Sequence, residues 1–279
     1  KNAEQSVGKS GIKVTGGHIV MNGTSENLGG AKPDDADPMQ DPYIDINIRG
    51  GVIDMNDSAK IALRSASGGS INITGGTVNV NGDNQIVDGV NLSNAVINIA
   101  DGAKLSTLDY LGEDDSLSRS VINLGQNGSL NISGALDSNV DGNGFINFNN
   151  NGAKITGNVN MTEGGVMNVG LNNAVIDGDA TFNSGSTLKL EIADSGNGYL
   201  QANSITGNEG SKLALNITKQ MEINQSESFE LLKGEVTDNF TKEISNNRYK
   251  VTSEDGKNFK VTYENSASDV VNDAGGTSS

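Results

Sequence analysis

The chain has 279 residues, a formal net charge of −16, no cysteine and only 4% aromatic residues. The acidic balance argues against nucleic acid and against an anionic membrane surface as partners, and the lack of cysteine removes disulfide bonds and thiolate chemistry. Glycine and asparagine together exceed a quarter of the residues, which suits many tight turns and does not suit long helices. Because apolar and polar residues alternate in many short runs, we expect an ordered, all-β chain.

The first alternating runs lie in GIKVTGGHIVMNG, at residues 11–23. Residues 24–42 then hold all three prolines and five acidic residues without alternation, and proline cannot donate to a strand ladder, so this segment is expected to be a loop. Alternation resumes at residues 43–56 and 68–82. Pairs of glycines precede several strands and are expected to mark bends, where a Cβ would clash, at 16–17, 50–51, 75–76 and 164–165.

Residues 121–190 form the most regular stretch of the sequence. The same alternating pattern restarts at Val121, Phe145, Val166 and Thr187, at spacings of 24, 21 and 21 residues. A period near twenty residues built from short strands is typical of a solenoid, in which each repeat buries its apolar side chains only against its neighbours. The predicted fold is an all-β, right-handed parallel β-helix over residues 1–210, with about nine or ten turns stacked at the usual strand spacing.

The middle residue of each strand defines a predicted column of outward side chains. Its apolar neighbours point inward because side chains alternate along a strand, which assigns Ile122, Leu124, Ile146 and Phe148 to the core. The amides of the column could bind a glycan or a second rod, or they could bond only to one another. The members of the column are Asp54, Asn79, Asn98, Asn123, Asn147, Asn168 and Lys189.

Acidic clusters lie in the first loop and in a second interruption at residues 106–120. Their carboxylates could ligate calcium, could form the paired acids of a glycoside hydrolase, or could be solvated loop charges. His18 is the only histidine, so a catalytic triad or a two-histidine metal site has little support, and no metal or cofactor is expected. The loop residues singled out as candidate binding groups are Asp34, Asp35, Asp37, Tyr110, Glu113, Asp114 and Asp115.

The pattern changes after Leu190. Residues 249–252 and 259–263 alternate on either side of an Asp-Gly turn, which is a strong signal for a β-hairpin. A solenoid leaves its last turn with unpaired backbone and an open core, so residues 211–264 are expected to form a cap that is continuous with the solenoid. Residues 265–279 have no apolar pattern and are expected to be a linker or a disordered tail.

Five short segments follow one another in the C-terminal third: LKLEI at 188–192, SGNGYL at 195–200, KLALNI at 212–217, FELL at 229–232 and VTDNF at 236–240. With these segments in this order, residues 11–263 resemble the passenger domain of a bacterial autotransporter, the exported part of a type V secretion protein. In that family the β-helix ends in a folding-promoting cap, which precedes a linker and a membrane barrel. The resemblance implies export through the outer membrane, with membrane attachment only through a C-terminal barrel that this sequence lacks.

The same resemblance implies an extracellular rod on a Gram-negative cell surface. Its function would be adhesion to a host surface protein or glycan, or self-association that builds aggregates or biofilm. The family's serine proteases carry a Gly-Asp-Ser-Gly motif that this chain lacks, so a non-enzymatic function is expected. A polysaccharide-degrading β-helix, such as a lyase or a tailspike-like hydrolase, and a purely structural stalk stay open as alternatives. Deletion of residues 24–41 is expected to leave the fold intact but to reduce binding.

Overall fold

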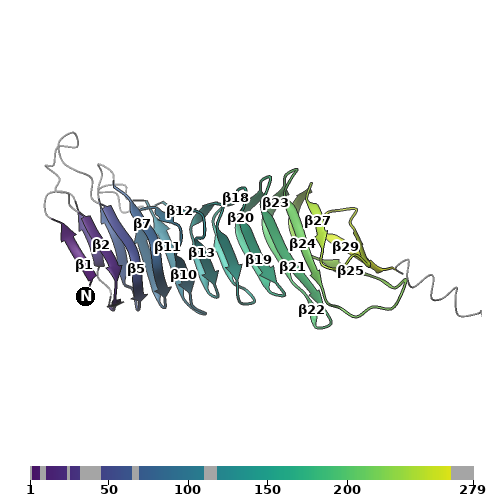
Figure 1. Ribbon diagram of the computed structural model, residues 1–279, viewed down its shortest axis with the longest axis horizontal. Coiled ribbons are helices and arrows are strands. Elements are labelled where there is room, and N and C mark those ends of the chain that lie inside the picture. The colour runs from purple at the N-terminus through teal and green to yellow at the C-terminus, as the bar shows by residue number, and fades with distance from the viewer. Residues whose placement is uncertain are drawn as a thin grey trace, which may run out of the picture.

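The computed structural model describes residues 2–6, 11–23, 26–31, 45–64, 69–109 and 118–264. Figure 1 shows an elongated stack of strands that runs from the N-terminus to a small separate sheet at the other end. Each turn of the chain contributes up to three strands, and each strand pairs in parallel with the equivalent strand one turn later. The fold is the predicted right-handed parallel β-helix, and we name its three faces A, B and C.

Most strands belong to one face, but five longer strands bend at a corner and contribute to two faces. Face A holds ten described strands or parts of strands: β2 (Gly11–Gly16), the first half of β5 (Asp45–Met55), the first half of β7 (Ile71–Val80), β9 (Val90–Leu92), β12 (Val121–Leu124), β15 (Asn139–Gly142), β18 (Val159–Met161), and the second halves of β20 (Asn173–Phe182), β23 (Tyr199–Gly207) and β26 (Leu232–Asp238). Face B holds ten: β3 (His18–Met21), the second halves of β5 and β7, β10 (Val96–Ile99), β13 (Ser129–Ile132), β16 (Phe145–Phe148), β19 (Val166–Gly170), β21 (Thr187–Ala193), β24 (Lys212–Ile217) and β27 (Thr241–Ile244). Face C holds nine: β4 (Glu26–Ala31), β6 (Lys60–Arg64), β8 (Asp83–Val87), β11 (Lys104–Leu108), β14 (Ala135–Asp137), β17 (Lys154–Thr156) and the first parts of β20, β23 and β26.

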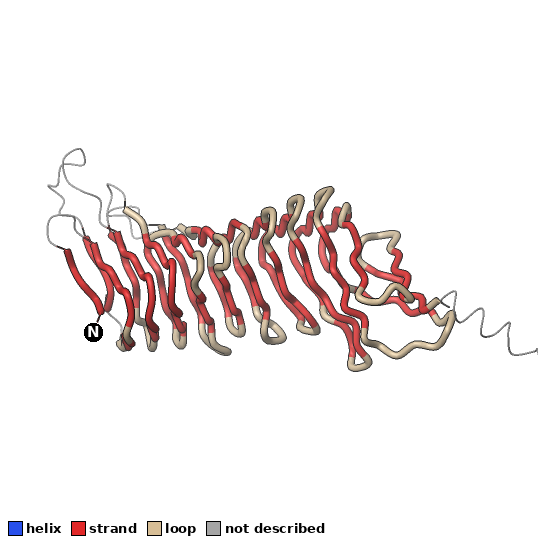
Figure 2. Tube along the Cα trace, in the orientation of Figure 1, coloured by secondary structure: helices blue, strands red, loops and turns tan. Residues whose placement is uncertain are grey.

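Inward-pointing apolar side chains from the three faces form one continuous core along the stack. Ile122, Leu124, Ile146 and Phe148 are all buried, as the alternation predicts. Figure 2 shows that strands make up most of the turns and that the connections gather at the corners. Every turn therefore buries its apolar residues against the turns on either side, which explains how a chain with 34% hydrophobic residues keeps an ordered core.

The four predicted glycine pairs all lie at the corner between face A and face B. In β7, a Cβ on Gly75 would lie 2.2 Å from the backbone oxygen of Arg49 in the preceding turn. The second glycine of the pair, Gly76, has a φ of 79°, in the left-handed region that residues with a side chain rarely adopt. At 50–51 and 75–76 the stacked turns come too close to leave room for side chains, whereas Gly164 has open space where a Cβ would point but a φ of 89°. All four pairs lie where the chain passes from face A to face B, so the prediction that they mark bends is confirmed.

The predicted boundaries of the two loops were wrong. Residues 26–31 form strand β4, which pairs with β6, and residues 106–108 belong to strand β11. Parallel pairing uses backbone groups, so a segment without apolar alternation can still extend the stack. A deletion of residues 24–41 would therefore remove a strand of face C.

Both interruptions leave the β-helix at the corner between face C and face A, since one follows β4 and the other follows β11. The base of the second is closed by a β-bridge between Leu108 and Arg119 and by a hydrogen bond from the N–H of Asp109 to the carbonyl oxygen of Ser118, at 2.8 Å. This corner lies opposite face B in the triangular cross-section. The segments that follow β4 and β11 therefore neither begin nor end beside face B.

Antiparallel strands occur at both ends of the stack. β1 (Asn2–Ser6) pairs with β2, and β22 (Gly196–Asn197) folds back on β21 as a short hairpin. β25 (Ser226–Glu230), β28 (Tyr249–Thr252) and β29 (Asn258–Tyr263) form the separate C-terminal sheet. The predicted hairpin is confirmed, because β28 and β29 pair from Tyr249 with Tyr263 to Thr252 with Lys260.

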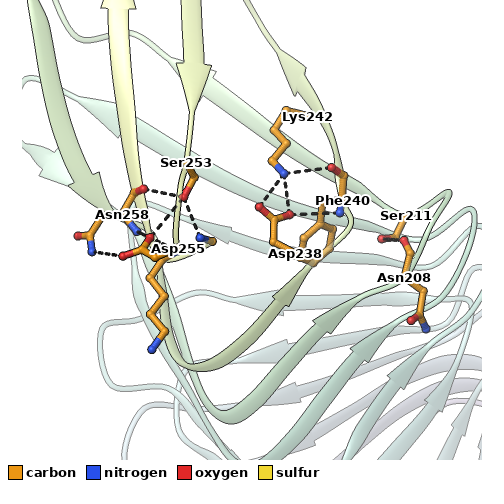
Figure 3. A network of polar contacts seen from close by, with 10 residues as sticks. Asn208, Ser211, Asp238, Phe240, Lys242, Ser253, Asp255 and Asn258 are labelled. Atoms are coloured by element: carbon orange, nitrogen blue, oxygen red, sulfur yellow. Dashed lines mark hydrogen bonds and ion pairs between the residues drawn. The ribbon is translucent and has the colours of Figure 1, made fainter.

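Phe240 packs near the C-terminal end of the β-helix, where the core continues into Phe229, Phe259 and Val261 of the separate sheet. The ring centroid of Phe240 lies 5.5 Å from that of Phe182, and the ring occupies the space over Gly207, where a Cβ would lie 2.4 Å from it. Lys242 donates to both carboxylate oxygens of Asp238, at 2.6 and 2.7 Å (Figure 3). This ion pair spans the turn that carries Phe240, so it holds the ring in place.

The turn between β28 and β29 is ordered by Asp255. Its carboxylate accepts hydrogen bonds from the side chain and the backbone N–H of Asn258 and from the backbone N–H of Lys257 (Figure 3). These bonds hold the pKa of Asp255 below its usual range, the side-chain bond from Asn258 contributing most.

None of the described residues forms a helix long and apolar enough to cross a membrane.

Candidate interaction surface

The predicted column of outward side chains exists on face B, with one member exchanged. Asp54, Asn79, Asn98 and Asn147 stack one per turn, and Asn168 and Lys189 continue the column by backbone register. The residue between Asn98 and Asn147 is Asn131, not Asn123. From Asp54 to Lys189, the face B column is therefore Asp54, Asn79, Asn98, Asn131, Asn147, Asn168 and Lys189. The strand register continues it to Val20 at one end and to Ala214 and Glu243 at the other.

The placement of Asn123 on face B was wrong because the second interruption adds residues between face C and face A, which shifts the strands that follow it to other faces than a regular repeat predicts. After β11 the chain passes through residues 109–120 and re-enters the stack on face A, so VINL at 121–124 is a face A strand. The segment that stacks on VINI of β10 is SLNI of β13, which contains Asn131. Both segments have the same local alternation, so the strand pattern alone does not distinguish them.

The amides of the face B column bond to one another as a ladder. The Nδ2 of Asn79 donates to Oδ1 of Asp54 at 2.8 Å, and Asn98 donates to Asn79 at 3.0 Å. Asn131 donates to Asn98, and Asn147 donates to Asn131, both at 2.8 Å. Each amide inside the ladder thus uses one N–H and accepts one bond, which leaves a second N–H and further acceptor capacity for an outside partner.

Asp54 fixes the direction of this ladder. A carboxylate can only accept, so Asn79 must turn its NH₂ group toward Asp54 and its oxygen toward the next turn, and each later amide follows. The other carboxylate oxygen of Asp54 contacts Nε2 of His18. The hydrogen bond from Asn79 and then the one from His18 hold the pKa of Asp54 below its usual value, so the carboxylate is charged at neutral pH.

Asn123 belongs to a second ladder, on face A. Asn72 donates to Asn47 at 3.0 Å, Asn91 donates to Asn72 at 2.9 Å, and Asn123 donates to Asn91 at 3.0 Å. The column then reaches Asp141, which accepts a bond from Asn160. Bonding between amides is therefore a general feature of this rod, and it does not by itself identify a binding face.

Face B differs from the other faces in what stands beside its amides. A second outward column lies two residues before the first along each strand, and its members are small, β-branched or aromatic. Val52 and Phe145 are 36% and 37% exposed, which is high for large apolar side chains. The members of this column from β5 to β21 are Val52, Thr77, Val96, Ser129, Phe145, Val166 and Thr187.

Between Asp54 and Lys189, the outward residues of the face B strands carry no charge. Face C, by contrast, presents charged side chains on its strands, including Lys104, Asp137, Lys154 and Asp177. In a chain with a net charge of −16, an uncharged stripe that crosses five turns is unusual. The sequence carried a signal for it, since the residue two places before each asparagine of the column is Thr, Val, Ser, Phe or Val.

The loop residues predicted as binding groups lie outside the described residues: Asp34, Asp35, Asp37, Tyr110, Glu113, Asp114 and Asp115.

At the base of the second interruption, burial raises the pKa of the Asp88 carboxyl above its usual value, and Asp109 nearby adds to the shift. The N–H of Gly89 donates to Asp88 at 2.8 Å and opposes it. In the described part of the chain, no three His, Asp or Glu side chains gather in a way that could hold a metal ion.

Comparison of the chain with protein-family models, with curated proteins and with solved structures gave no match.

Proposed function

We propose that this chain is a self-associating rod of a bacterial cell surface and that two copies pair through face B in antiparallel orientation. One observation carries the proposal: the uncharged stripe on face B is bounded by Asp54 at one end and Lys189 at the other, each three turns from Asn131. A contact between identical surfaces must be self-complementary about a two-fold axis. Face B meets this condition when the axis passes through Asn131.

Counting turns from that axis gives the facing pairs. Asp54 of one copy lies opposite Lys189 of the second copy, and the reverse pair forms at the other end. Between them, Asn79 faces Asn168, Asn98 faces Asn147, and the two copies of Asn131 face each other. The parallel arrangement would instead place Asp54 against Asp54 and Lys189 against Lys189, so like charges oppose it.

The two columns of face B supply different parts of the contact. Val52, Val96, Phe145 and Val166 provide apolar area that leaves water on pairing. Asn79, Asn98 and Asn131 each use one donor and one acceptor within the ladder and can turn the remaining N–H toward an amide oxygen of the second copy. Because the ladder holds each amide in a fixed rotamer, less side-chain entropy is lost on pairing.

A single face B contact is expected to be weak. Seven strands at about 4.8 Å spacing, each offering about four residues at about 3.3 Å, cover about 400 Å² per copy. The total of about 800 Å² is below the roughly 1,200 Å² of the smallest stable standard interfaces. Many rods displayed together on a surface would multiply such contacts, so the proposed activity is aggregation of cells rather than a stable dimer in solution.

Clustering of beads that carry the protein at high density tests the proposal. Asn131→Lys places two ammonium groups opposite each other at the two-fold axis, and clustering should fall at least tenfold because the charges repel and lose water. Asn91→Lys is the matched control. Asn91 also donates one ladder bond and accepts another, but it stands on face A, so the charge change and the ladder damage are equal while face B stays intact.

Circular dichroism and thermal unfolding of both variants establish that each keeps the β-helix. Clustering lost with Asn131→Lys and kept with Asn91→Lys supports pairing through face B. Equal clustering by both variants, or equal loss, would contradict it.

A further inference from the structure

The face B column ends in a surface trough, of which the pairing described above uses only Asn168 and Lys189. The trough has a volume of about 420 Å³ and crosses four successive strands, β19, β21, β24 and β27. Asn168, Lys189, Ala214 and Glu243 stand along one side. Gly170, Glu191, Asn216 and Ser245 line the other. Side chains of adjacent turns along each side are about 4.8 Å apart, as stacked strands require.

Two local features hollow out this part of face B. In β19 the register shifts between Asn168 and Gly170, and Gly170 has a φ of 62° with open space where a Cβ would point. The chain therefore leaves face B at Gly170. Strands β21 and β24 continue beyond the level of Gly170 before they end. Figure 1 shows β21 and β22 extending at the edge of the stack. Ala214 then leaves a gap in the column between Lys189 and Glu243.

The polar groups of the trough keep both donors and acceptors available. Glu243 pairs with Lys212 at 3.1 Å through Oε1, and Glu191 accepts from Asn216 at 3.3 Å through Oε1, so each carboxylate retains a second oxygen. The Ser245 hydroxyl accepts the N–H of Ile217 at 3.0 Å and can still donate its own hydrogen. Lys189 adds an ammonium group for which the described residues provide no ion pair.

This arrangement selects among ligand classes. A peptide strand along the trough would run across β19, β21, β24 and β27 and could not pair with their backbones, so recognition falls to side chains. Glu191 and Glu243 oppose a polyanion, and Lys189 opposes a polycation. A hydroxyl group both donates and accepts, which matches a carboxylate and an amide on each side of the trough and the ammonium group of Lys189 on one side. We propose that the trough binds an uncharged oligosaccharide whose chain runs along the axis of the rod.

A printed array that carries uncharged, sulfated and sialylated oligosaccharides tests this assignment with fluorescently labelled protein. The concentration is kept below the level at which the rods cluster, so that pairing through face B does not contribute. Uncharged oligosaccharides should bind, and their binding should change less than twofold between 50 and 500 mM salt, because no net charge is neutralised. No binding to any uncharged saccharide, or binding only to sulfated or sialylated spots, would overturn the assignment.

Ala214→Gln fills the middle of the trough and should weaken binding at least tenfold. Ala135→Gln, at an outward alanine of face C, is the matched control and should bind as the parent does. Ala214 lies one turn beyond Lys189, outside the facing pairs of the antiparallel contact, so Ala214→Gln should still cluster beads. Equal saccharide binding by Ala214→Gln and Ala135→Gln would mean that the saccharide binds outside the trough. If Asn131→Lys loses clustering but still binds the saccharide, the two sites are separate, and that result tests only the pairing through face B.

Discussion

At the scale of single residues, buried or hydrogen-bonded carboxylates set how this acidic rod responds to pH. Asp54 and Asp255 have pKa values held below the usual range by hydrogen bonds, so each contributes stability that is present above the normal carboxyl pKa and is lost as the pH falls through its folded value. Asp88 is the opposite case. Burial raises its pKa, so its contribution is present below the normal carboxyl pKa and is lost as the pH rises through the raised folded value.

Asp88→Asn should therefore raise the thermal unfolding temperature at pH 7, because the amide keeps the shape of the side chain without the cost of burying a charge beside Asp109. The gain should disappear at pH 3, where Asp88 is protonated in both states. Asp101→Asn, at an exposed turn residue, removes the same unit of charge and serves as the control. Melting curves of the parent and both variants from pH 3 to pH 7 measure the change in unfolding temperature. If Asp88→Asn raises the unfolding temperature by the same amount at pH 3 as at pH 7, burial of the Asp88 charge is not the cause.

At the scale of elements, each strand of the stack is stabilised by its neighbours, and the end of the stack needs a special solution. On face B, β27 is the last described strand, and it pairs only with β24 of the preceding turn. Phe240 packs on Phe182 at this end, Asp238 with Lys242 holds its turn in place, and Phe259 of the C-terminal sheet is buried in the same core. In a stack of repeats an exposed end unfolds first, so this packing protects β24 and β27 from local opening.

Phe240→Ala should destabilise the C-terminal turns by about 3–5 kcal/mol, the usual cost of truncating a buried phenylalanine. Phe145→Ala removes the same atoms from an exposed site on face B and should cost less than about 1 kcal/mol. Hydrogen exchange resolved along the chain measures where the loss falls. Faster exchange confined to β24, β26 and β27 is the expected result, and uniform acceleration from β5 onward would instead indicate that the whole rod unfolds as one unit.

At the scale of the whole molecule, the proposed pairing depends on the order of charges along the rod axis. Asp54 and Lys189 belong to the same column but are separated by six turns of stacking, about 29 Å at the usual strand spacing. No contact within one copy joins them. Their complementarity therefore has an effect only between copies, and only in the antiparallel orientation centred on Asn131.

A charge exchange tests that register directly. Asp54→Lys places like charges opposite each other in the paired state, and so does Lys189→Asp, so each single variant should reduce bead clustering severalfold. The double variant restores opposite charges at both ends and should recover most of the clustering. The hydrogen bonds of Asp54 with His18 and Asn79 are lost both in Asp54→Lys and in the double variant, so they cannot account for recovery. A double variant that clusters no better than either single would rule out this register.

Local sequence pattern was sufficient to predict the parallel β-helix, its approximate number of turns, the core positions of Ile122 and Phe148, and the C-terminal hairpin. Alternation of apolar and polar residues with a recurring period requires strands that bury one side, and an Asp-Gly turn between two such strands favours a hairpin. These features depend on residues that are near one another in the chain. The resemblance to an autotransporter passenger and the surface location stay predictions.

Only the tertiary structure decided which strands stack on one another. Asn123 and Asn131 occupy strands with the same alternation, but Asn123 lies on face A and Asn131 on face B. The difference arises because the second interruption alters the number of residues between corners. Strand β4 forms because β6 offers it backbone partners, although its own sequence does not alternate. The match between Asp54 and Lys189 and the trough at Ala214 arise from stacking residues that are far apart in the chain, which no local pattern records.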